Sequence, residues 1–144
     1  MLGMKQMVYR YIGSGSGRKV FDLGNGYVIK VAKNIAGIAQ NHVEYQISFN
    51  DNSNLFAEVI EVSGDFKFLI MKKADTINSF SHVLKYFNVS NSREFIRLKG
   101  IQTIQWKYNL LLADLCKKSS WGIIDGIPVI IDYGFTKQVQ RRYY

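Results

Sequence analysis

Short apolar runs separated by glycine-rich or polar turns occupy the first half of the chain, and this pattern is typical of an antiparallel sheet. The segment Gly24-Asn25-Gly26 predicts a tight turn between two of these runs, because glycine and asparagine tolerate positive φ. Apolar residues in 37–49 recur at roughly helical spacing and predict an inserted helix. The predicted strands are 7–12, 19–23, 27–32, 56–62 and 66–71.

The second half of the chain has a mostly helical pattern. Helices are predicted over 78–87 and 92–112. The longer helix has Ser92 as its expected N-cap, and Gly100 either interrupts it or separates two helices. No element is predicted for 137–144, because this segment lacks apolar periodicity.

A short hairpin is predicted after the helices, because Asp125-Gly126 is a strong turn signal between two apolar runs. Five strands with one inserted helix, followed by helices and a hairpin, make an α+β fold. We expect a boundary near residues 71–75. Residues 1–72 would then form an N-terminal lobe and 73–144 a reduced helical lobe, with a cleft between them.

The composition favours a folded protein of the cytoplasm. Apolar residues make up 47% of the 144 residues, which is enough for a packed core, and Trp106 and Trp121 are expected to anchor it. No run approaches the roughly 18 uninterrupted apolar residues of a membrane helix, and the first residues do not resemble a secretory signal. Cys116 is the only cysteine, which agrees with a reducing compartment and argues against structural zinc.

The net charge of +8 favours polyanionic partners such as nucleotides, nucleic acid or acidic protein surfaces. The basic residues are scattered, so a solvated surface that promotes solubility explains the same charge. A nucleic-acid-binding protein of another fold, with exposed aromatic residues such as Tyr143 and Tyr144, is therefore an alternative function. A reduced lobe that leaves apolar surface uncovered would also favour a homodimer or another protein partner.

A glycine-rich segment between the first two predicted strands is a candidate phosphate-binding loop. Its residues are Gly13, Ser14, Gly15, Ser16 and Gly17. Glycines at a hairpin tip let backbone N–H groups approach phosphate oxygens, because no Cβ stands in the way. The strand-to-strand context argues against a P-loop and a dinucleotide fold. A flexible hairpin tip is the alternative interpretation.

Lys30 lies within an apolar run, between Ile29 and Val31, on a strand expected to be half buried. A buried ammonium without a partner is costly, and Glu44 on the following helix is the nearest acidic candidate. A Lys30–Glu44 ion pair could hold the ammonium towards a phosphate. A lysine that snorkels from the sheet edge is the alternative.

Two aspartates in the second half are candidates for phosphoryl-transfer chemistry. Asp132 follows an apolar strand directly and precedes Tyr133-Gly134, a position suited to holding Mg²⁺. Asp114 lies at the end of the long predicted helix, and the predicted hairpin separates it from Asp132. Two carboxylates brought to one site in this way suit phosphoryl transfer, although turn-capping aspartates are common.

The order of these segments resembles the protein-kinase and aminoglycoside-phosphotransferase superfamily over nearly the whole chain, from about Tyr9 to Phe135. Five segments match. They are the glycine loop at Gly13–Val20, the lysine strand at Tyr27–Lys30, the hinge at Phe68–Lys73, the catalytic loop at Asp114-Leu115 and the metal-binding turn at Ile131–Gly134. The resemblance implies a kinase-like fold: a five-stranded N-terminal sheet with one helix, and a C-terminal helical lobe. In its compactness the chain resembles small kinase-like proteins of phages and bacteria.

The resemblance also implies roles for individual residues. Lys30 would bind the α- and β-phosphates of ATP, and Glu44 would orient it. Asp114 would orient or deprotonate an acceptor hydroxyl, and Asp132 would hold Mg²⁺. Met71 would stand at the hinge, whose backbone would bind adenine. ATP and Mg²⁺ are thus the implied cofactors.

The chain departs from the family pattern in three ways. Leu112-Ala113 precede Asp114, where the family has His-Arg. Ser119, or Ser120 if the loop is one residue longer, stands where the family has a metal-binding asparagine, and this argues against a second Mg²⁺. Ten residues follow Gly134, which leaves no room for an activation segment or the later helices. A minimal phosphotransferase and a pseudokinase, which keeps the fold without transfer, are therefore both consistent with the sequence.

Overall fold

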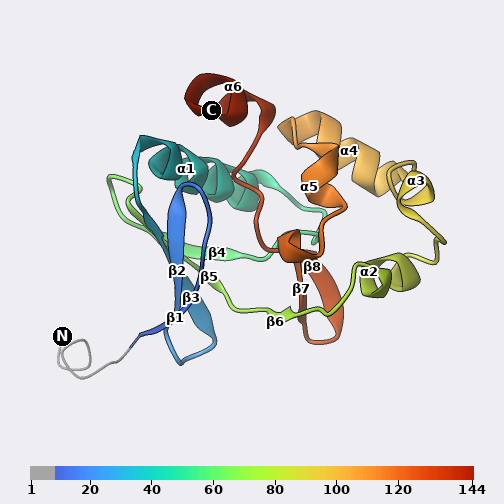
Figure 1. Cartoon of the computed structure of the whole chain (residues 1–144), viewed down its shortest axis with the longest axis horizontal. Helices are drawn as coiled ribbons and strands as arrows, with labels where there is room; N and C mark the ends of the chain where they lie inside the picture. The colour runs from blue at the N-terminus through green and yellow to red at the C-terminus, as the bar shows by residue number, and fades with distance from the viewer. Residues whose placement is uncertain (1–8) are drawn as a thin grey trace.

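The computed structural model describes residues 9–144. Its first half is a five-stranded antiparallel sheet with strand order β1-β2-β3-β5-β4 (Figure 1). The strands are β1 (Arg10–Ser14), β2 (Arg18–Asp22), β3 (Tyr27–Ala32), β4 (Val59–Val62) and β5 (Phe68–Lys72). The helix α1 (Ile35–Asn50) packs against β3, β4 and β5. The predicted five-stranded sheet with one inserted helix is therefore confirmed.

The edges of the elements differ slightly from the predictions. The first strand was expected at 7–12, but 7 and 8 lie outside the described residues. The described strand extends through Gly13 and Ser14, so part of the glycine-rich segment is sheet rather than loop. Asn34 caps α1, because its side chain accepts a hydrogen bond from the Gly37 N–H at 2.9 Å. The helix consequently begins two residues earlier than its apolar spacing suggested.

The second half contains short helices and a small three-stranded sheet on the other side of the molecule (Figure 1). The helices are α2 (Ser81–Tyr86), α3 (Ser92–Phe95), α4 (Lys99–Tyr108), α5 (Leu112–Leu115) and α6 (Lys137–Tyr143), with a 3₁₀ turn η2 (Lys118–Ser120). The strands are β6 (Asp75–Thr76), β7 (Trp121–Ile124) and β8 (Ile127–Ile130). Asp125 and Gly126 both have positive φ, as the predicted hairpin turn requires.

The prediction of one continuous helix over 92–112 is wrong, because α3 and α4 are separate helices and α5 begins only at Leu112. Leu98 is extended, with ψ at 134°, and Asn109 is left-handed, with φ at 55°. Gly100 lies inside α4 instead of interrupting a helix. The turn at Leu98 lets Phe95 on one side and Ile101 on the other each reach the core. Tertiary packing thus outweighs the local helical spacing.

Two further expectations about the second half differ from the structure. The segment after Thr136 forms the helix α6, whose N-cap side chain accepts from the Val139 N–H at 3.2 Å. This short helix packs against α1. Trp106 is 81% exposed on α4 and does not anchor the core, whereas Trp121 is buried as expected. Among residues 9–144, the structure contains no helix with the length and hydropathy of a membrane span.

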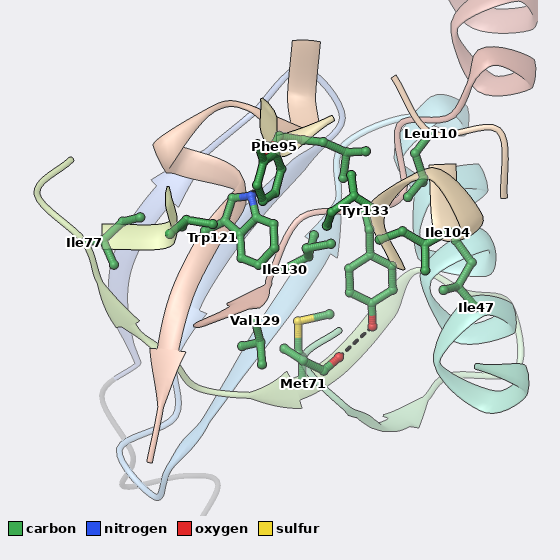
Figure 2. Packing of buried hydrophobic residues seen from close by; sticks show 14 of the residues in the cluster. Ile47, Met71, Ile77, Phe95, Ile104, Leu110, Trp121, Val129, Ile130 and Tyr133 are labelled. Atoms are coloured by element: carbon green, nitrogen blue, oxygen red, sulfur yellow. Dashed lines mark hydrogen bonds between the residues drawn. The ribbon is translucent and has the colours of Figure 1, made fainter. Parts of the chain in front are cut away.

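One hydrophobic cluster joins the two halves of the molecule (Figure 2). Trp121 and Phe95 pack edge to face from the C-terminal half, and Met71 reaches the cluster from the five-stranded sheet. Tyr133, which follows β8, donates from its hydroxyl to the Ala57 carbonyl at 2.6 Å. This packing fixes the segment after β8 against the sheet, and that segment carries Asp132.

Candidate functional site

Four charged side chains from distant parts of the sequence meet between the sheet and the C-terminal half. Arg18 stands at the start of β2 and Lys30 in the middle of β3. Glu44 lies in the middle of α1, and Asp132 directly follows β8. Lys30 shares a buried face of its strand with Val28, in line with the period-two alternation of a strand.

The Glu44 carboxylate is the centre of this cluster. Arg18 donates to it twice, from Nη1 at 2.6 Å and from Nη2 at 2.9 Å. Lys30 Nζ lies 2.9 Å and 3.1 Å from its two oxygens, which forms the ion pair expected from the sequence. The backbone N–H of Tyr133 donates to it at 2.9 Å. Within the described part of the chain, no buried polar side-chain atom lacks a partner, so the buried carboxylate is fully satisfied.

Burial and charge act in opposite directions on these groups. Burial alone would raise the pKa of Glu44, but the charges of Arg18 and Lys30 and their hydrogen bonds outweigh it and lower the pKa to about 2. Burial lowers the pKa of Lys30, and the neighbouring Arg18 charge acts in the same direction. Glu44 opposes this by favouring the ammonium form of Lys30. The carboxylate therefore stays ionised at neutral pH.

Two contacts extend the cluster to the segment after β8. Arg18 Nη2 lies 3.0 Å from Asp132 Oδ1, and Lys30 Nζ donates to the Ile131 carbonyl at 2.6 Å. The Asp132 side chain is 55% exposed, whereas Arg18 and Lys30 are each 5% exposed. The cluster is thus buried around Glu44 and exposed to solvent at Asp132.

Arg18 is the site residue that sequence reasoning missed. It stands directly after the glycine-rich segment, and the Lys30–Glu44 pair was inferred without it. The signal was the strand alternation: Arg18 and Val20 share a face of β2, and Val20 pairs with Lys30 across the sheet. An arginine on that face needs an acidic partner, and Glu44 was already the candidate.

The glycine-rich segment has one tightly packed end and one open end. An added Cβ on Gly17 would lie 2.9 Å from the Gly37 Cα, so these two glycines let the loop approach α1 closely. Gly13 and Gly15 have no heavy atom within 4 Å of an added Cβ. Ser14 accepts from Lys33 Nζ at 3.0 Å, and Ser16 donates to the Tyr144 hydroxyl at 2.8 Å.

Asp114 and Asp132 line one small hollow, together with apolar neighbours that include Leu110 and Phe135. Asp114 lies in α5 and pairs with Lys117 at 3.1 Å. The hairpin of β7 and β8 carries the chain from one aspartate to the other. The sequence spacing of the two carboxylates therefore corresponds to proximity in the fold.

Met71 and Ser119 are placed differently from the other candidates. Met71 is fully buried, and its strand is paired on both flanks, with β3 and with β4. Its side chain belongs to the core. Ser119 is exposed in η2, and no contact among the described residues joins it to Asp132.

As these side chains lie, the predicted ligands Asp132 and Ser119 do not form a divalent-cation site together. Mg²⁺ takes oxygen ligands in octahedral geometry, usually from one or two carboxylates. Asp132 already accepts from the Arg18 guanidinium, and Ser119 does not accompany it. Residues 9–144 contain no group of three or more His, Cys, Asp or Glu side chains that could hold a metal ion.

Comparison with known proteins shows the fold and leaves the sequence family open. No family model matches the chain, and no curated protein matches it by sequence. A ternary complex of APH(2″)-IIa, an aminoglycoside phosphotransferase, with streptomycin and ATP is 16% identical, with a TM-score of 0.50 over 90% of this chain. A gentamicin complex of the same enzyme is 17% identical, with a TM-score of 0.51 over 88% of this chain.

The chain spans 66% and 64% of those two structures, just under two thirds of each. At such identities the likeness concerns the fold. The five-stranded antiparallel sheet with its single helix matches the N-terminal lobe of these phosphotransferases. The chain therefore has a protein-kinase-like α+β fold.

Proposed function

We propose that this protein binds a nucleoside triphosphate between its five-stranded sheet and its C-terminal half. The observation that carries the proposal is the cluster of Arg18, Lys30, Glu44 and Asp132, in which two cations from the sheet meet the segment after β8. Phosphate groups bind where fixed cations and backbone N–H groups converge.

Three further observations support a phosphate ligand. Glu44 holds the Lys30 ammonium with two contacts near 3 Å, so the charge is positioned before any ligand arrives. An added Cβ on Gly13 or Gly15 would meet no heavy atom within 4 Å, so there is free space beside the hairpin of β1 and β2, in which the Gly15 N–H donates to the Arg18 carbonyl. A structure of the same fold is a complex with ATP, which suggests the triphosphate as the ligand class.

We further propose Asp114 as the residue that would orient an acceptor hydroxyl during phosphoryl transfer. It shares a hollow with Asp132, and Lys117 holds its carboxylate at 3.1 Å. Transfer of this kind depends on positioning and charge stabilisation rather than on covalent chemistry by the protein. Nucleotide binding without transfer is the second candidate, and the Arg18 contact on Asp132 favours it.

Thermal unfolding with ATP tests the binding proposal. A ligand that binds only the native state at a hundred times its Kd stabilises that state by about 2.7 kcal/mol, which raises the Tm. We expect this rise in the wild type and in Lys19→Ala, which removes an exposed charge from the opposite face of β2. We expect Lys30→Ala to lose it. A Tm that ATP leaves unchanged in the wild type would contradict the proposal.

Two additional assays separate the remaining candidates. Transfer of radiolabelled phosphate from ATP that disappears in Asp114→Asn would indicate phosphotransferase activity, and binding without any transfer would indicate a pseudokinase. Steeply salt-dependent binding to DNA or RNA that Lys30→Ala leaves unchanged would instead favour the nucleic-acid alternative.

A further inference from the structure

We infer that Arg18 supplies the positive charge that a divalent cation would otherwise bring to Asp132, so that nucleotide binding depends little on Mg²⁺. This inference rests on the proposed nucleotide function and specifies its ion requirement.

The first step in the argument is that Arg18 is fixed in place. Its Nη1 donates to Asn41 Oδ1 at 3.0 Å and to Glu44 at 2.6 Å. Its Nη2 donates to Glu44 at 2.9 Å and to Asp132 at 3.0 Å. Four of the five guanidinium N–H donors are thus used by three acceptor side chains. With an exposed fraction of 5%, this arginine is part of the interior and is unlike a mobile surface residue.

The second step concerns the charge of the site. Arg18 and Lys30 balance the two carboxylates of Glu44 and Asp132, so the cluster is close to neutral without a metal ion. An arriving phosphate would meet Asp132 with its charge already offset by a guanidinium 3.0 Å away. In a phosphoryl-transfer site, Mg²⁺ reduces the repulsion between carboxylate and phosphate. In this protein the Arg18 guanidinium is positioned to have the same effect.

The third step concerns competition for Asp132. A divalent cation bound there would stand beside a guanidinium that cannot lose its proton, because the charge and hydrogen bonds of Glu44 outweigh the effect of burial and raise the pKa of Arg18 above its ordinary value. A cation that took Asp132 Oδ1 would displace Arg18 from a position with four hydrogen bonds. Asp114 lines the same small hollow as Asp132, but Lys117 already holds its carboxylate at 3.1 Å, and the described residues contain no group of three or more side chains that could hold a metal ion.

The test is the affinity for ATP, measured by isothermal titration calorimetry in buffer with EDTA and in buffer with excess Mg²⁺. We expect the two Kd values of the wild type to agree within tenfold. A Kd more than tenfold weaker in EDTA would overturn the role of Arg18 and leave the proposed function standing. Absence of binding in both buffers would overturn the proposed function itself, and the inference with it.

Asp132→Asn separates the two roles of the aspartate by the sign of its effect. If Asp132 is a metal ligand, loss of its charge weakens binding in Mg²⁺. If Arg18 serves in place of the metal, the loss frees the guanidinium for phosphate and removes a repulsive charge. We therefore expect a Kd in both buffers that is no more than threefold weaker than that of the wild type. Any greater weakening would overturn the inference.

Arg18→Gln provides the complementary measurement, with Lys19→Gln as its matched control on the same strand. Both variants remove one positive charge, but Lys19 is exposed and lies on the opposite face of β2. We expect Arg18→Gln to weaken ATP binding in EDTA by tenfold or more and Lys19→Gln to leave it within threefold. Equal effects of the two substitutions would overturn the inference. Circular dichroism checks that Arg18→Gln is folded. If this variant does not fold, the measurement on Asp132→Asn tests the inference in its place.

Discussion

Replacing Glu44 by glutamine removes the charge that holds the buried cluster together while nearly keeping the shape of the side chain. Glu44 is fully buried and accepts from Arg18, Lys30 and the Tyr133 backbone. A glutamine carries one acceptor oxygen in place of two, and its amide N–H groups would face the donors of Arg18 and Lys30. Breaking a buried ion pair by removing one partner costs roughly 3–5 kcal/mol, because uncompensated charge stays buried.

Urea unfolding at pH 7 measures this cost. Small domains have a total stability of roughly 5–15 kcal/mol, so the loss is large, and it corresponds to a Tm about 10 °C lower. Glu58→Gln is the control, because Glu58 pairs with Lys72 at 3.4 Å on the surface with a 61% exposed side chain. That substitution should cost less than about 1 kcal/mol. A cost below about 1 kcal/mol for Glu44→Gln would refute the view that its carboxylate organises the site.

The same carboxylate makes stability depend on acid. Its pKa falls from 4.5 to about 2 on folding, so the unfolded chain takes up the proton first as the pH falls. The stabilisation is therefore present above pH 4.5 and is lost as the pH falls towards 2. At about 1.4 kcal/mol per pH unit the loss amounts to roughly 3 kcal/mol. Glu44→Gln should lack this part of the acid dependence, and an unchanged acid profile in the variant would contradict the assignment.

Three further substitutions test the packing around the site by urea unfolding. Gly134→Ala should destabilise by roughly 1–3 kcal/mol, because its Cβ would lie 2.5 Å from the backbone oxygen of Gln40, and wild-type stability would contradict that contact. Gly100→Ala should stabilise by up to about 1 kcal/mol, since it lies inside α4 with nothing within 4 Å, and a loss of stability would show that α4 is misplaced. Tyr133→Phe should cost about 1–2 kcal/mol because the buried Ala57 carbonyl loses its donor, and a neutral effect would argue against that hydrogen bond.

Local chemistry explains which parts of the fold were predictable. The turn at Asp125-Gly126 follows from residues that accept positive φ, and the buried lysine of β3 could be matched with Glu44 because a buried charge needs a partner. Both inferences use residues within a short stretch or between adjacent elements. Arg18 was missed because its partners lie 26 and 114 residues away, and the strand alternation that places it on the face of Lys30 becomes informative only once β2 and β3 are paired in register.

The errors in the second half have a common physical cause. Helical spacing continues through Leu98, yet the chain turns there so that Phe95 and Ile101 both enter the core. Trp106 shows the reverse effect, because a large apolar side chain on α4 stays exposed once the core is filled by other residues. Propensity and periodicity describe single segments, whereas these outcomes depend on which segments compete for the same interior.

The ion pairs on Glu44 have a consequence for how the molecule unfolds. One carboxylate receives donors from β2, from β3 and from the segment after β8, so no single element can detach without leaving a buried charge behind. Contacts between positions more than a hundred residues apart also slow the search for the native state. The two halves should consequently melt in one cooperative transition, with few partly opened forms beneath it.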